Sequence, residues 1–132
     1  MINTKLFRKT FLLLFIVGVL NLLATIFYFY WTIWWFDMVV HFLAGVCVGM
    51  VAILFWYYRL GLTLDVWKMV QMSILSVFII GILWEIYELY FDITSFSDGM
   101  FYVTDTISDI IMDISGGFLG SLYAIRTFNK KI

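Results

Sequence analysis

Proline and cysteine are almost absent from this sequence: it contains no proline, and Cys47 is its only cysteine. A single cysteine excludes an internal disulfide and any metal site built from paired cysteines. Cys47 lies within an apolar run, where we interpret it as a small packing residue. Linkers and low-complexity tracts are lacking too, so nothing in the sequence indicates a second domain.

Charged residues are also scarce, at 13% of the chain, whereas 64% of the residues are apolar and 21% are aromatic. This composition lies outside the range of soluble globular domains. A helix that crosses a bilayer needs about 20 predominantly apolar residues, and residues 11–30, 38–58, 69–91 and 104–128 approach or meet that length. We therefore predict an all-α fold: one domain over residues 1–132, a four-helix transmembrane bundle whose polar faces point toward one another.

Positive charge is missing from one end of this predicted bundle. The Lys and Arg residues lie only at the two termini and in one short middle loop: Lys5, Arg8, Lys9, Arg59, Lys68, Arg126, Lys130 and Lys131. Because cytoplasmic segments are enriched in Lys and Arg, both termini are predicted to be cytoplasmic in a bacterial cytoplasmic membrane. The first apolar run is too long for a secretory signal, so we expect it to remain as an anchor.

Negative charge gathers at the opposite, outward-facing end, with His41 beside it. Eight of the nine acids are predicted to lie there: Asp37, Glu85, Glu88, Asp92, Asp98, Asp105, Asp109 and Asp113. An Asp at the centre of an inserted helix costs about 2.5–3.5 kcal/mol. With no Lys or Arg at this end, the cost must be offset by protonation, by a water-filled cavity or by a bound cation.

The spacing of these residues favours a cation. Seven of them recur at steps of three or four, which places each set on one side of its helix: Asp37 and His41; Glu85 and Glu88; Asp105, Asp109 and Asp113. Carboxylates with one imidazole suit Mg²⁺, Mn²⁺, Fe²⁺ or Zn²⁺, and so many ligands allow one ion or two.

We divide these residues into two predicted roles. The predicted metal ligands are Asp37, His41, Glu88, Asp109 and Asp113. Glu85 or Asp105 is predicted to act as the general base that activates a metal-bound water.

Structural explanations compete with this assignment at some positions. Asp37 and Asp105 can each be a helix cap, because an acid suits a helix N-terminus, and a lone His is often only a hydrogen-bonded polar residue. Capping does not explain Glu85 and Glu88, which are predicted near a helix C-terminus, or Asp109 and Asp113, which are predicted one and two turns inside. We interpret Asp92 and Asp98 as solvated loop acids.

Two pairs of glycines lie on the cytoplasmic side of the acids. Gly45 and Gly49, and likewise Gly116 and Gly120, have the G-x-x-x-G spacing that lets helix backbones approach closely in lipid. Such spacings also occur by chance in membrane helices. We expect these two helices to pack closely and to form the floor of a cup that holds the carboxylates.

The same residues resemble a known family. Asp37-x-x-x-His41-Phe-x-Ala-Gly45, Glu85-x-x-Glu88 and Asp105-x-x-x-Asp109-x-x-x-Asp113 are similar to motifs of the VanZ-like and YjdF-type small bacterial membrane proteins. Asp113 stands where VanZ-like members usually have Asn, Glu88 where Gln is usual, and Met38 where Lys is usual. These departures make the YjdF-type branch the closer match. The resemblance implies a role in the cell envelope and no particular reaction.

Together these observations predict a metal-dependent hydrolase or transferase that acts on a membrane lipid or lipid-linked envelope precursor. One alternative is a cation- or proton-coupled carrier, which would need to be a homo-oligomer because four short spans are few. Another is a non-catalytic envelope protein with a structural metal. No nucleic-acid partner is expected.

Overall fold

A computed structural model describes residues 4–61 and 65–129, and within them every regular element is helical. Four helices are long: α1 (Thr4–Ile26), α3 (Phe36–Leu60), α4 (Val66–Tyr90) and α5 (Met100–Asn129). Two short elements complete the chain, α2 (Phe29–Thr32) and the 3-10 helix η2 (Phe96–Asp98). The all-α prediction is confirmed. Lys130 and Lys131 lie outside the described residues.

Three of the long helices are long and apolar enough to cross a membrane: α1, α3 over Phe36–Arg59, and α4. The last long helix, α5, has 30 residues but also carries Asp105, Asp109, Asp113 and Arg126. These charges lower its apolar character below that of the other three. Three membrane-spanning helices are therefore supported, and the fourth span remains a prediction.

Two helix ends differ from the ends of the predicted spans, and local backbone conformation and capping explain both. The first helix ends at Ile26 rather than near Tyr30, because Tyr28 adopts a left-handed conformation (φ 58°) and the chain turns into α2. At the start of α4, the Asp65 side chain caps the helix by accepting a hydrogen bond from the Trp67 backbone N–H. This capping role explains the one acid at the basic end.

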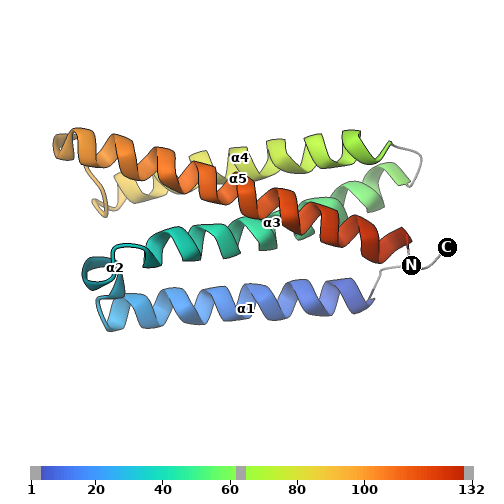
Figure 1. Ribbon diagram of the computed structural model, residues 1–132, viewed down its shortest axis with the longest axis horizontal. Helices are drawn as coiled ribbons and strands as arrows, with labels where there is room; N and C mark the ends of the chain where they lie inside the picture. The colour runs from blue at the N-terminus through green and yellow to red at the C-terminus, as the bar shows by residue number, and fades with distance from the viewer. Residues whose placement is uncertain (1–3, 62–64, 130–132) are drawn as a thin grey trace.

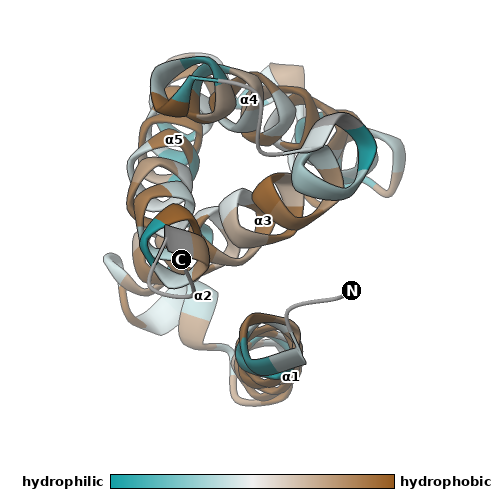
Figure 2. Cartoon of the chain, turned by 90° about the vertical axis from the view of Figure 1, so that its right-hand side faces the viewer, coloured by the Kyte–Doolittle hydropathy of each residue, from teal (hydrophilic) through white to brown (hydrophobic). Residues whose placement is uncertain are grey.

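The four long helices run side by side, with α2 and η2 at one end and both ends of the described chain at the other (Figure 1). Viewed along the bundle, α3, α4 and α5 form a triangle, and α1 lies outside it (Figure 2). Only Leu6, Thr10 and Ala24 of α1 are buried. The first helix is therefore a peripheral element, in contrast to the prediction that all four polar faces meet.

The tightest packing joins α3 to α5 through the two glycine pairs. A Cβ added to Gly45, Gly49, Gly116 or Gly120 would come within 3.0 Å of a backbone atom of the facing helix. The predicted close packing of these two helices is confirmed. Between this crossing and the end of the bundle that carries both ends of the described chain, the interior is mostly apolar, with a cluster that includes Leu6, Ile53 and Ala124. The polar groups of the candidate site lie on the other side of the crossing.

Substitution of Gly116 is expected to destabilise the fold strongly. A Cβ at Gly116 would overlap the Phe42 carbonyl group, and backbone atoms of two packed helices cannot yield as a flexible side chain can. Overpacking of this kind typically costs about 1–3 kcal/mol. Gly116→Ala should therefore lower the thermal unfolding midpoint in detergent, whereas Gly18→Ala, with open space around it, should not. Equal midpoints for the two variants would contradict this packing.

Candidate metal centre

The candidate site is organised around His41, which lies in the second turn of α3 and is 7% exposed. Its two ring nitrogens face different carboxylates. Nε2 lies 3.6 Å from Oδ1 of Asp37, one turn earlier on the same helix, and 3.6 Å from Oδ2 of Asp109 on α5. Nδ1 lies 3.3 Å from Oδ1 of Asp113. One imidazole thus joins three carboxylates from two helices.

Asp37, His41 and Asp109 have the geometry of a metal-binding triad. One ligand atom from each lies within 4.8 Å of the other two. Ligand atoms held at about 2.0–2.2 Å from an ion lie about 3.0–3.5 Å apart in tetrahedral or octahedral geometry. The 3.6 Å separations around Nε2 are close to that range.

Asp113, also a predicted ligand, does not belong to this triad. It is 8% exposed and lies beside Nδ1, the nitrogen that faces away from Asp37 and Asp109. A His that binds metal through one nitrogen commonly donates its other N–H to a carboxylate, which fixes the tautomer and the ring orientation. The geometry of Asp113 matches that orienting role. Gly81 on α4 provides the space, because a Cβ there would lie 3.0 Å from Oδ2 of Asp113.

Glu85 and Glu88 lie outside the triad, each with its own hydrogen bond. Glu85 is 5% exposed and accepts a 2.8 Å hydrogen bond from the Thr106 hydroxyl, which links α4 to α5. Glu88 is half-buried and accepts a 3.0 Å hydrogen bond from the Trp84 indole N–H on its own helix. The predicted ligand Glu88 is therefore not among the three residues that share ligand geometry.

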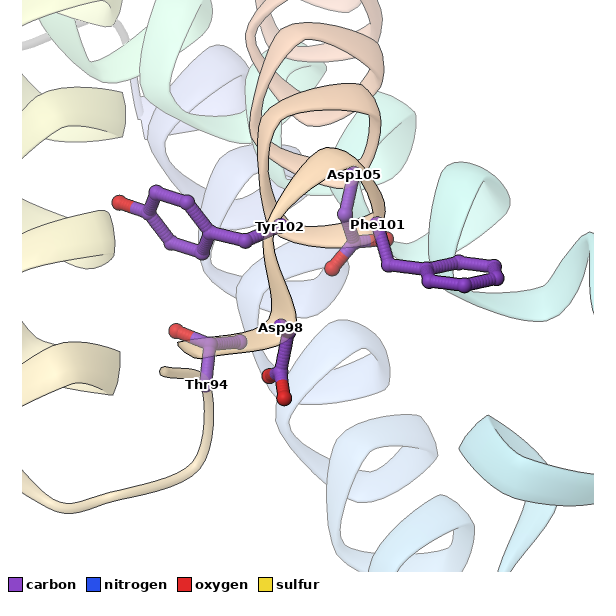
Figure 3. A pocket seen from close by; sticks show the side chains of 5 residues that line it. All are labelled: Thr94, Asp98, Phe101, Tyr102 and Asp105. Carbon is purple, nitrogen blue, oxygen red and sulfur yellow. The ribbon is translucent and has the colours of Figure 1, made fainter. Parts of the chain in front are cut away.

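Asp105 is exposed and lines a pocket of about 350 Å³ with Thr94, Asp98, Phe101 and Tyr102 (Figure 3). It lies one helical turn before Asp109, so the pocket adjoins the triad along α5. Since α5 begins at Met100, Asp105 lies inside the helix, and the capping explanation does not apply to it.

The other predicted loop acids differ in their surroundings. Asp98 is exposed and accepts a hydrogen bond from the Ser95 backbone N–H in a capping box. Asp92 is exposed and adopts a left-handed backbone conformation with a φ of 56°. Both acids are exposed in the connection between α4 and α5, as predicted for solvated loop acids. Asp98 also lines the pocket.

Tyr30 belongs to the surroundings of the site but was not singled out by the sequence. Its hydroxyl donates a hydrogen bond to Oδ1 of Asn21 on α1. Burial of that hydroxyl, together with the negative charges of Asp37 and Glu88, raises the pKa of Tyr30 to about 12. Tyr30 therefore stays protonated at neutral pH. No spacing signal marks it, because aromatic residues are common throughout this chain.

Acidic side chains outnumber basic side chains at the site. Asp37, Asp109 and Asp113 surround one imidazole, and within residues 4–61 and 65–129 no Lys or Arg pairs with them. A protonated His41 would offset one of three negative charges. A divalent ion beside a neutral imidazole would offset two.

Comparison with known proteins gives one result that bears on the class of the molecule. No curated protein and no solved structure matches the chain significantly. The model of one family, described as "Predicted membrane protein (DUF2238)", matches residues 3–130, which is nearly the whole chain. The chain therefore belongs to this family of membrane proteins.

Proposed function

We propose that this protein is a metal-dependent hydrolase or transferase of the bacterial cytoplasmic membrane, acting on a lipid or lipid-linked envelope substrate. It forms one domain of four spans with both termini in the cytoplasm. The observation that carries the proposal is the environment of His41: Nε2 faces Asp37 and Asp109, and Nδ1 faces Asp113.

The proposed fourth span is α5. Its charged residues divide into two groups that suit a helix in a membrane. Asp109 and Asp113 are buried against other helices, so lipid does not meet them. Arg126 lies in the last turn, where a long side chain can extend to the membrane surface. The glycine contacts with α3 place much of α5 beside an apolar span.

The proposed orientation follows from the positions of the Lys and Arg residues in the described part of the chain. Lys5, Arg8, Lys9, Arg59, Lys68 and Arg126 all belong to the end where the described chain begins and ends (Figure 1). Positive-inside enrichment places that end in the cytoplasm. The metal centre then lies near the outer leaflet, at the depth of lipid headgroups.

The proposed ligands are Asp37, His41 and Asp109, with Asp113 orienting the imidazole. A divalent ion held there would lower the pKa of a bound water and would stabilise negative charge that develops on a phosphoryl or acyl oxygen. Asp105 is the better placed of the two predicted bases, because it is exposed in the adjoining pocket. Glu85 is buried and bonded to Thr106, so we assign it to holding α4 against α5.

In hydrolysis, Asp105 would take a proton from the attacking water, and the water oxygen would form a bond to phosphorus or to the acyl carbon. The bond to the leaving oxygen breaks, and that oxygen leaves as an alcohol once it receives the proton from Asp105. In transfer, a hydroxyl of the acceptor molecule replaces water. No Lys or Arg of the described residues lies at this end, so the metal must balance the charge of the substrate by itself.

A lipid or lipid-linked substrate is supported by the depth of the site and by the resemblance to VanZ-like and YjdF-type envelope proteins. The carrier alternative is disfavoured, because the glycine crossing and an apolar cluster follow the acids toward the other end of the bundle. An ion would find no charged relay there.

The test is turnover of phospholipid and polyprenyl-phosphate substrates by purified protein reconstituted with Mg²⁺, Mn²⁺, Fe²⁺ or Zn²⁺. Wild-type protein should turn over one class with one of these ions, and His41→Ala and Asp109→Asn should show none. Ser115→Ala is the control, because that side chain is exposed and its hydroxyl donates to the Ile111 carbonyl of its own helix. Metal binding without turnover of any such substrate would favour the structural-metal alternative over the enzyme.

A further inference from the structure

A second cavity lies at the opposite end of the molecule, between the start of α1 and the end of α3. It is a groove of about 270 Å³ lined mainly by Phe7, Phe11 and Leu14 from α1 and by Val51, Leu54 and Phe55 from α3. The Thr10 hydroxyl in its wall already donates to the Leu6 carbonyl. Tyr58 of α3 is the other lining residue with a hydroxyl, and the rest of the groove surface is apolar.

Two exposed arginines lie within one helical turn of lining residues of this groove. Arg8 lies three residues before Phe11, and Arg59 lies four residues after Phe55, so each is a surface neighbour of a lining aromatic residue. Since α1 and α3 run in opposite directions (Figure 1), a position before Phe11 on α1 and a position after Phe55 on α3 both lie toward the same end of the bundle. Neither forms an ion pair with an acid in residues 4–61 or 65–129.

We propose that this groove is a binding site for one anionic phospholipid. An acyl chain occupies the apolar groove, and the headgroup phosphate lies between Arg8 and Arg59. Guanidinium groups match phosphate oxygens with paired hydrogen bonds, and anionic lipids are concentrated in the cytoplasmic leaflet. The site lies at the other end of the bundle from the metal centre and does not depend on it.

A second copy of this chain is a poorer occupant than a lipid. A symmetric contact through this surface would bring Arg8 and Arg59 of one copy toward the same residues of the other. Like charges with no acid nearby oppose that contact. An anionic amphiphile satisfies both the apolar groove and the two positive charges.

The test uses delipidated protein in a neutral detergent, titrated with phosphatidylglycerol and analysed by native mass spectrometry. Wild-type protein should retain one molecule, and phosphatidylcholine, which has no net charge, should bind more weakly. Arg8→Gln combined with Arg59→Gln should weaken phosphatidylglycerol binding by about tenfold or more. Leu14→Trp, which fills the groove, should weaken it as well.

Ile16→Trp is the matched control, because residue 16 lies on the face of α1 opposite Phe7. It adds the same bulk to an exposed position and should leave lipid binding unchanged. Far-UV circular dichroism and the unfolding midpoint should agree among all the variants. Equal lipid retention by wild type and the arginine double variant would overturn the proposal. A dimer lost in Leu14→Trp, with no lipid bound, would assign the groove to a second copy instead.

Discussion

Asp105→Asn is expected to lower kcat by about 10²–10⁴-fold while the metal content of the protein stays unchanged. Asparagine keeps the size of the side chain but cannot take a proton from a metal-bound water. Asp105 is exposed in the pocket that adjoins the triad and does not belong to the three residues with ligand geometry. Steady-state turnover and elemental analysis of the same preparation measure the two quantities.

Asp92→Asn is the control for this variant. Asp92 is also exposed and acidic, but it lies in the connection after α4 and does not line the pocket. Its left-handed backbone conformation suits asparagine well. If kcat of Asp105→Asn equals that of Asp92→Asn, the role of Asp105 as base is wrong, and Glu85 becomes the remaining predicted base.

Divalent metal is expected to raise the free energy of unfolding of the wild-type protein by about 4 kcal/mol at a free concentration of 1,000 times Kd. The ion stabilises the native state because the unfolded chain does not hold Asp37, His41 and Asp109 together. Unfolding in detergent, followed with and without metal, measures the difference. His41→Ala should show almost none of this increase, whatever its stability without metal.

In the same experiment, Asp113→Ala shows whether Asp113 orients the imidazole or is itself a metal ligand. Loss of a carboxylate that orients a metal-binding His typically weakens metal binding by about 10–100-fold. Asp113→Ala should therefore keep a reduced but measurable stabilisation at high metal concentration. Complete loss, equal to that of His41→Ala, would show that Asp113 is itself a ligand, as the sequence pattern first indicated.

The sequence predicted the parts of this site that depend on helical periodicity. Asp37 and His41 are one turn apart on α3, and Asp109 and Asp113 are one turn apart on α5, so their shared faces follow from spacing alone. The glycine pairs at Gly45 and Gly116 predicted which two helices approach closely, because only glycine permits backbone contact at that distance.

Periodicity could not predict which carboxylate meets which atom. Glu88 and Asp113 both lie on inward faces, but the position and rotation of α4 and α5 around α3 decide which one contacts His41. In the structure that residue is Asp113, while Glu88 bonds to Trp84. These choices arise from tertiary packing between helices that are far apart in sequence.

The peripheral position of α1 also could not be predicted from the spacing of its polar residues. One polar side chain of α1 already has a partner within the helix, because the Thr25 hydroxyl donates a hydrogen bond to the Asn21 carbonyl. That group therefore needs no partner inside the bundle. The contact between Tyr30 and Asn21 depends on the left-handed turn at Tyr28, which no sequence signal marked.

Elemental analysis of detergent-purified protein tests the metal centre most directly. Wild-type protein reconstituted with Mg²⁺, Mn²⁺, Fe²⁺ or Zn²⁺ and then desalted should retain about one equivalent of one of these ions. A folded variant carrying both His41→Ala and Asp109→Asn should retain none. No retained metal in the wild type with any of the four ions would contradict the account, leaving His41 and its carboxylates as a proton-sharing cluster.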